Sequence, residues 1–158
     1  MKKPDLREIG MEQLQLQLKE WGQPAFRAKQ IKEWLWQKNA LSTDVMLNLP
    51  KGLREQLNEA YSFHAALLKE QQVSSDRTVK CAFEVEGSKV VEGVLIPTAK
   101  RMTACISSQV GCSLSCKFCA TGRLKMMRNL SAGEIFDQVN YLKRFAEQNY
   151  DTPLTNIV

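Results

Sequence analysis

The periodicity of the apolar residues changes near residue 63, and this change restricts the chain to a mixed fold. Before it, apolar side chains recur at the three- and four-residue spacings of amphipathic helices, as in the stretch MEQLQLQLKEWG. Gly22 is expected to end the first helix, and Pro24 and Pro50 are expected to begin the next two. The sequence therefore predicts a helical accessory domain over residues 1–62.

After this point the chain consists of short β-prone runs separated by turn residues. The runs over 63–97 predict an antiparallel β extension. Residues 98–158 read as a βαβ unit, which is typical of a parallel sheet. The unit consists of a strand at Thr103–Ser107, a loop, a helix capped by Ser131 with Glu134, and a terminal apolar run. The predicted fold class is α+β, ending in the first βαβ unit of a (β/α) barrel. The barrel is expected to be incomplete, because a complete one takes about 250 residues.

Three of the five cysteines lie close together, at Cys112, Cys116 and Cys119. Thiolates at this spacing suit a soft metal centre, either zinc or an iron–sulfur cluster. A structural zinc site normally has four protein ligands. The further candidates for a fourth ligand are Cys81, Cys105 and His64. Three ligands from one loop favour a [4Fe-4S] cluster with one iron open to a small molecule.

The spacing CxxxCxxC, after a strand and before a helix, resembles the radical S-adenosylmethionine (SAM) superfamily. Its flanks are similar to one family in particular, the RlmN type of RNA methyltransferase. The similar stretches are PAFRAKQIKEWLW, VEGVLIP, CISSQVGC, and RNL with EI. The resemblance covers essentially the whole chain and implies a radical SAM barrel, a [4Fe-4S] cluster on the three cysteines, SAM at the open iron, and Phe118 beside the SAM adenine.

The same resemblance implies two catalytic residues, Glu92 and Cys105. In the family, one SAM methylates a cysteine in the C-terminal half, and radical chemistry from a second SAM joins that methyl carbon to C2 of an adenosine in 23S rRNA or tRNA. Glu92 would accept the C2 proton, and Cys105 would attack the methylated sulfur and form a transient disulfide. The methyl-carrying cysteine and a Gly-Glu-Pro segment are absent from this sequence, so we expect the chain alone to be inactive.

The charge of the chain is compatible with an RNA partner. Its 22 Lys and Arg exceed its 17 Asp and Glu by five. The basic residues expected to contact phosphate lie on the second helix and around the cysteine loop: Arg27, Lys29, Lys32, Lys38, Lys100, Arg101, Lys117, Arg123, Lys125 and Arg128. No secretory signal and no apolar run of about 20 residues is present, so we expect a cytoplasmic location without a membrane partner. The family implies 23S rRNA, tRNA and an electron donor such as flavodoxin as partners.

Two alternatives stay open. The related resistance enzymes that methylate C8 of adenosine share Cys105 and the cluster motif, and product analysis would separate the two activities. A zinc-stabilised RNA-binding module without catalysis would need Cys105 or Cys81 as a fourth ligand, and metal analysis would identify it.

Overall fold

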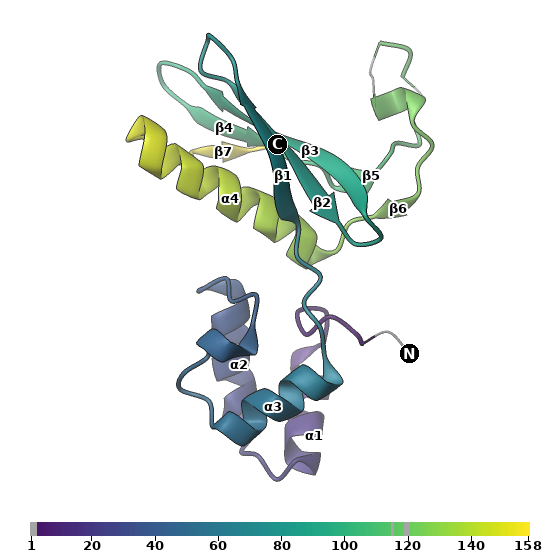
Figure 1. The fold of residues 1–158 in the computed structure, drawn as a ribbon, viewed down its shortest axis with the longest axis vertical. Coiled ribbons are helices and arrows are strands. Elements are labelled where there is room, and N and C mark those ends of the chain that lie inside the picture. The colour runs from purple at the N-terminus through teal and green to yellow at the C-terminus, as the bar shows by residue number, and fades with distance from the viewer. Residues whose placement is uncertain (1–2, 115, 119–120) are drawn as a thin grey trace. The chain divides into compact units, whose positions relative to one another are not determined.

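The computed structural model describes residues 3–114, 116–118 and 121–158 (Figure 1). The chain divides into two compact units, one ending at His64 and the other beginning at Ala65. Each unit has its own hydrophobic core. Within the described ranges, no helix combines the length and the apolar character that a membrane crossing requires.

The first unit is helical, as predicted. Its elements are α1 (Met11–Glu20), α2 (Phe26–Trp36), the short 3-10 helix η1 (Thr43–Val45) and α3 (Lys51–Ala60). The predicted stop at Gly22 is confirmed: its φ is +68°, and the next N–H donates back to the Leu18 carbonyl over 2.8 Å. Pro50 directly precedes α3 as expected. Helix α2, however, begins two residues after Pro24, because the Pro24 carbonyl accepts from Arg27 in a preceding turn.

The core of the first unit comes from one apolar stripe on each helix. The fully buried side chains include Leu14 and Leu18 of α1, Ile31 and Leu35 of α2, and Leu57 of α3. Removing each such side chain from water contributes roughly 1.5–3 kcal/mol before the loss of conformational entropy is counted. The three helices therefore hold together through their apolar faces, in agreement with the predicted periodicity.

The second unit is built on a five-stranded sheet. Its elements are β1 (Leu67–Val73), β2 (Val79–Val85), β3 (Lys89–Pro97), β4 (Met102–Cys105), β5 (Gln109–Val110), the 3-10 helix η2 (Thr121–Arg123), β6 (Arg128–Asn129), α4 (Ala132–Tyr150) and β7 (Asn156–Ile157). The strand order is β1-β2-β3-β4-β7, and β5 pairs separately with β6. The pairs β1–β2, β2–β3 and β3–β4 are antiparallel, and β4–β7 is parallel.

This topology modifies the predicted division between an antiparallel extension and a parallel sheet. The three antiparallel strands and the β4–α4–β7 unit share one continuous sheet. The sheet is therefore mostly antiparallel, and the expected parallel pairing is limited to β4 with β7. The predicted capping box at the start of α4 is confirmed, with both of its reciprocal hydrogen bonds present.

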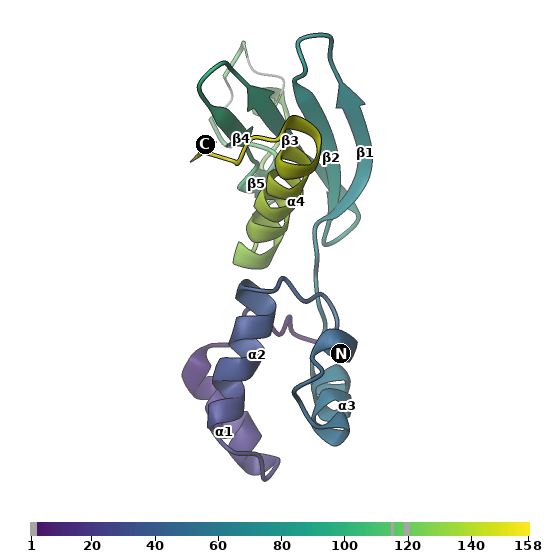
Figure 2. The same cartoon turned by 90° about the vertical axis from the view of Figure 1, so that its left-hand side faces the viewer.

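Helix α4 covers one face of the sheet and leaves the other face open (Figure 2). Along β2, residues facing α4 are buried and alternate with exposed or half-buried residues on the open face. Gly93 of β3 lets the helix approach closely, because a Cβ there would lie 3.0 Å from the Phe83 ring and 3.5 Å from Leu142. The candidate catalytic residues of the sheet lie on this open face.

Candidate active site

A small hairpin closes the base of the cysteine loop. In the β5–β6 pair, Val110 lies opposite Arg128, and the Met127 N–H donates to the Val110 carbonyl over 2.9 Å. One step further into the loop, the Cys112 N–H donates to the Leu124 carbonyl over 3.2 Å. The two ends of the loop are therefore held together by backbone hydrogen bonds at the first cysteine itself and two residues before it.

Two glycines allow the loop to fold back on itself. Gly111 has a φ of +78°, and a Cβ there would lie 2.2 Å from the Lys125 carbonyl oxygen. A Cβ on Gly122 would lie 2.7 Å from the Cys116 carbonyl oxygen and 2.8 Å from its nitrogen. Both approaches are too close for any side chain. At each glycine, the backbone of one side of the loop therefore packs directly against the backbone of the other side.

The cysteines of this loop are partly accessible. Cys112 and Cys116 are half-buried free thiols, and the Leu114 N–H points at Cys112 Sγ over 3.4 Å. Cys119 lies outside the described residues, and the described part of the chain contains no group of three potential metal ligands. A hollow of about 490 Å³ lies beside this segment. It is lined by Cys112, Ser113, Gly122, Arg123, Leu124, Lys125 and Met126.

A buried ion pair ties the loop to α4. The fully buried Glu134 carboxylate accepts from Arg128 Nη2 and Nη1, at 2.7 and 2.8 Å, and from the backbone N–H groups of Ser131 and Glu86, each at 2.9 Å. Burial alone would raise the pKa of Glu134, but the hydrogen bonds and charge of Arg128 and the hydrogen bonds of Ser131 together lower it. The carboxylate thus stays ionised and joins the end of the loop, the β2–β3 turn and the helix start.

Glu92 and Cys105 lie on the same open face of the sheet. The register pairs Cys105 of β4 with Val94 of β3, and Glu92 lies two residues from Val94 on the same face of β3. Diagonal neighbours of this kind are roughly 7–8 Å apart. Both side chains are exposed. The structure therefore places on one face the two residues to which the family resemblance gives catalytic roles, and these roles stay predictions.

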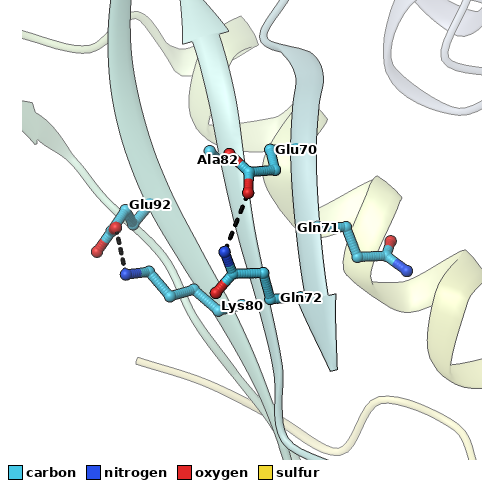
Figure 3. A pocket seen from close by; sticks show the side chains of 6 residues that line it. All are labelled: Glu70, Gln71, Gln72, Lys80, Ala82 and Glu92. Atoms are coloured by element: carbon cyan, nitrogen blue, oxygen red, sulfur yellow. Dashed lines mark hydrogen bonds and ion pairs between the residues drawn. The ribbon is translucent and has the colours of Figure 1, made fainter. Parts of the chain in front are cut away.

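A small polar pocket of about 110 Å³ surrounds Glu92 on this face (Figure 3). Lys80 Nζ lies 2.6 Å from Glu92 Oε1. Beside this pair, Gln72 Nε2 donates to Glu70 Oε1 over 3.0 Å. Gln71 points the other way, where its side chain accepts from the Tyr141 hydroxyl over 2.7 Å. The pocket thus contains two separate polar pairs from three neighbouring strands.

Ser107 links this face to the cysteine loop and to α4. Its hydroxyl donates to the Glu92 carbonyl over 2.8 Å. The fully buried Gln138 amide accepts from the Ser107 N–H over 3.1 Å and donates to the Ser107 carbonyl over 3.0 Å. A third cavity, of about 370 Å³, extends from Glu92 to the cysteine loop. Its lining residues are Val90, Val91, Glu92, Ser107, Gln109, Gly111, Thr121 and Leu124.

Phe118 projects into solvent at the tip of the loop, with 94% of its surface exposed. Leu114, Leu124 and Met127 are also exposed along the same loop. A bare aromatic ring beside partly accessible thiols is available to stack on a planar ligand. Its contact with an adenine ring stays a prediction.

The other candidates for a fourth zinc ligand differ in their availability. Cys81 is fully buried in the core, and burial raises the pKa of its thiol to about 11. The His64 ring lies in the helical unit, 2.9 Å from the Ser62 hydroxyl. Cys105 is exposed on the open face of the sheet. Of the two cysteines, Cys105 is therefore the one accessible to a metal ion, because Cys81 is buried in the core.

Besides Arg128, which pairs with Glu134, Lys32 has a structural role among the basic residues expected to contact phosphate. The Lys32 ammonium group donates to the carbonyls of Arg7 and Ile9. Burial lowers the pKa of Lys32, while the charge of Asp5 acts in the opposite direction. Lys29, on the same helix, is exposed. The basic surface of α2 is therefore smaller than the sequence indicated, because Lys32 is used to hold the chain entering α1.

Several residues important to this geometry were not identified from the sequence. Gln138 lies between Ile135 and Leu142 on the apolar stripe of α4, and a polar residue at such a position could have indicated a buried hydrogen-bonding role. Glu134 was identified only as a helix cap, without its partner Arg128. Nothing in the local sequence distinguishes Lys80, because its pairing with Glu92 depends on the strand register.

Known proteins match the chain from end to end. Residues 4–62 match the family described as "Ribosomal RNA large subunit methyltransferase N-terminal domain". A protein named "Probable dual-specificity RNA methyltransferase RlmN" from Cytophaga hutchinsonii is 49% identical over the whole chain, which covers 43% of that protein. The protein of the same name from Flavobacterium psychrophilum is 47% identical over the whole chain, which covers 46% of it.

A solved structure agrees with these relatives. The crystal structure of a radical SAM methyltransferase from Sphaerobacter thermophilus matches 98% of the chain with a TM-score of 0.79 and 35% identity, and the match covers 45% of that protein. The chain thus spans less than half the length of each of these proteins. Over its whole length the chain is similar to the N-terminal part of proteins of the RlmN family, and its residues 4–62 match that family's N-terminal domain.

Proposed function

We propose that this chain is the N-terminal part of a radical SAM methyltransferase that modifies C2 of adenosine in 23S rRNA and tRNA. The observation that carries the proposal is the common placement of Glu92 and Cys105 on the open face of the sheet, directly before the cysteine loop. The proton acceptor must reach the base and the sulfur nucleophile must reach the sulfur bonded to that base, so the two residues need to share a face. The names and identities of the relatives support the same activity.

The proposed architecture has three segments: a helical RNA-binding domain over 1–62, a β extension over 63–97 and the start of a radical SAM core over 98–158. The parallel pairing of β4 with β7 across α4 supports the last of these as the first βαβ unit of a (β/α) barrel. The open face of the sheet would then look into the barrel interior.

The cysteine loop fits an iron–sulfur cluster. Cys112, Cys116 and Cys119 would hold a [4Fe-4S] cluster, and Phe118 would lie beside the adenine of SAM. The N–H group directed at Cys112 Sγ and the two glycines without room for a Cβ are features of a backbone that wraps closely around a sulfur-bound group. The cluster and SAM together would supply the one-electron reduction that starts radical chemistry.

The chain's own residues would handle the proton and the sulfur. The Glu92 carboxylate would accept the proton that leaves C2 of the adenine. The Cys105 thiolate would bond to the sulfur of a methyl-carrying cysteine from the C-terminal half. The sulfur–carbon bond would break with its electron pair on the carbon, which would take up a proton as the methylated base leaves. Both exposed side chains can reach a base on the open face without a change in the sheet.

The proposed partners are 23S rRNA, tRNA and an electron donor such as flavodoxin, in the cytoplasm. Exposed Lys117, Arg123 and Lys125 around the cysteine loop would meet RNA phosphates or the electron donor. We expect RNA affinity to fall as salt concentration rises, because phosphate contacts release bound counterions.

Metal analysis of anaerobically purified and reconstituted protein tests this proposal. We expect iron and sulfide in nearly equal amounts with broad visible absorption, and loss of both in Cys116→Ser. Cys105→Ser is the matched control, because Cys105 is not a cluster ligand in this proposal and should leave the iron content unchanged. Zinc without sulfide, lost in Cys105→Ser, would instead establish a zinc-stabilised module. For the complete enzyme, methylation at C8 would identify the related resistance activity.

A further inference from the structure

Lys80 is the side chain that pairs with the Glu92 carboxylate. Its Nζ lies 2.6 Å from Glu92 Oε1 (Figure 3). The two side chains are about equally exposed, at 52% and 56%. Within the part of the chain that the structure describes, no other side chain is bonded to this carboxylate. A glutamate on an open sheet face samples several rotamers unless a partner selects one of them.

The strand register explains why Lys80 reaches this carboxylate. Lys80 of β2 lies opposite Val94 of β3, which in turn lies opposite Cys105 of β4. These three residues form one row across the open face, and Glu92 is one step away on the central strand. Glu92 is therefore a diagonal neighbour of both Lys80 and Cys105. Lys80 comes from β2 and Cys105 from β4, the two strands that flank β3.

A second carboxylate near Lys80 is held away from it. Glu70 of β1 lies opposite Ala82, and Gln72 lies opposite Lys80, so both flank the lysine. The Glu70 carboxylate accepts from Gln72 Nε2 instead, over 3.0 Å. This pairing leaves the Lys80 ammonium group to Glu92. The four side chains thus form two ordered pairs rather than one shared network (Figure 3).

We propose that Lys80 is a positioning residue for Glu92, holding one carboxylate oxygen so that the other faces the base on the open side of the sheet. The inference rests on the proposed role of Glu92 as the acceptor of the C2 proton. A carboxylate held by one oxygen has a fixed orientation, and proton transfer is sensitive to displacements of about 1 Å. Lys80 itself does not touch the base in this arrangement.

The geometry can be tested on this chain without any activity. In the ¹H–¹⁵N spectrum of lysine ammonium groups, Lys80 should give a signal protected from exchange with water, and Glu92→Gln should remove that protection. Glu84→Gln is the matched control, because it breaks the similar Lys69–Glu84 pair, 3.3 Å apart on the same sheet. A Lys80 signal that does not respond to Glu92→Gln would overturn the proposal.

Kinetics of the complete enzyme test the consequence. Lys80→Met should lower the rate of methylation about tenfold with little change in KM, and it should enlarge the isotope effect of RNA deuterated at adenine C2. Lys80→Arg should restore most of the rate, and Lys80→Met should add nothing in a Glu92→Gln background. If the wild-type enzyme forms 2-methyladenosine and Lys80→Met has the same rate and isotope effect, the positioning role alone is refuted. A wild type without this product would refute the proposed function instead.

Discussion

The Glu134 carboxylate offers the sharpest test of how the cysteine loop is held. Four N–H groups converge on its two oxygens. Oε1 accepts from Arg128 Nη2 and from the Glu86 backbone, and Oε2 accepts from Arg128 Nη1 and from the Ser131 backbone. Glu134→Gln keeps the shape of the side chain but replaces one of these oxygens by an NH₂ group. Whichever oxygen is replaced, one guanidinium N–H and one backbone N–H then face a donor.

The magnitude follows from the two lost hydrogen bonds. A hydrogen bond to a charged group contributes about 1.5–3 kcal/mol. Glu134 is fully buried and the side chain of Arg128 is 31% exposed, so solvent screens the pair only slightly. We therefore expect Glu134→Gln to lower the free energy of unfolding of the second unit by about 3–6 kcal/mol, a range that includes the cost of breaking a buried ion pair. Glu147→Gln on the same helix should change it by at most about 0.5 kcal/mol, because its partner Lys143 is 4.0 Å away and exposed.

Hydrogen exchange measured by mass spectrometry at increasing urea concentrations gives this free energy for peptides of α4 and β2. All three tryptophans belong to the first unit, at positions 21, 34 and 36, so tryptophan fluorescence provides an internal control that should not change. A loss below 1 kcal/mol, or one equal to that of Glu147→Gln, would refute the assigned role of the four-donor site.

The pH dependence of the same free energy provides an independent check. The folded-state pKa of Glu134 is lower than its ordinary value of 4.5. The stability that Glu134 contributes is therefore fully present above pH 4.5 and is lost as the pH falls through the folded-state pKa. Urea unfolding of the second unit at pH 6 and at pH 3.5 should show this loss, and Glu134→Gln should reduce the difference between the two.

Three further predictions concern other parts of the chain. Lys32→Glu should lower the free energy of unfolding of the first unit by about 2–4 kcal/mol, because the new carboxylate would face two backbone carbonyls. Lys29→Glu, at an exposed position of the same helix, should change it by less than about 0.5 kcal/mol. Urea unfolding followed by tryptophan fluorescence would compare the two variants. In the folded chain, iodoacetamide should modify Cys105 quickly and leave buried Cys81 unmodified, and equal rates by mass spectrometry would contradict the assigned sheet faces. Gly111→Ala should abolish iron retention while the far-UV circular dichroism stays unchanged, because its Cβ has no room inside the loop; a variant that keeps its iron would contradict this packing.

Local features of the sequence predicted the local features of the fold. The stop at Gly22 and the capping box at Ser131 depend on residues within a few positions of each other, and both are present. The extent of the sheet could not be predicted in this way. The pairing of β3 with β4 and of β4 with β7 joins segments that are separated in sequence by turns and by a whole helix. Such pairings depend on tertiary packing rather than on local propensity.

In the candidate site, too, local sequence features were predictable and contacts between strands were not. The spacing of Cys112 and Cys116 is visible in the sequence. Glu92 and Cys105 are identified as candidates through the family resemblance. That Glu92 has Lys80 as its partner follows only from the register, because a shift of one residue would turn one of them to the α4 face. The interactions that position the site are therefore less visible in the sequence than the groups that would carry out the chemistry.

Helix α4 contributes to the site from the opposite face of the sheet. Glu134 holds the end of the cysteine loop through Arg128, and Gln138 holds the backbone of Ser107, whose hydroxyl in turn binds the backbone of Glu92. Both helix residues are fully buried, and neither lines the cavities described on the open face. Their substitution would thus displace the loop or the β3–β4 pair without removing any group from the site. A loss of activity in a Gln138→Met variant that still folds would therefore report a change in position rather than a missing reactive group.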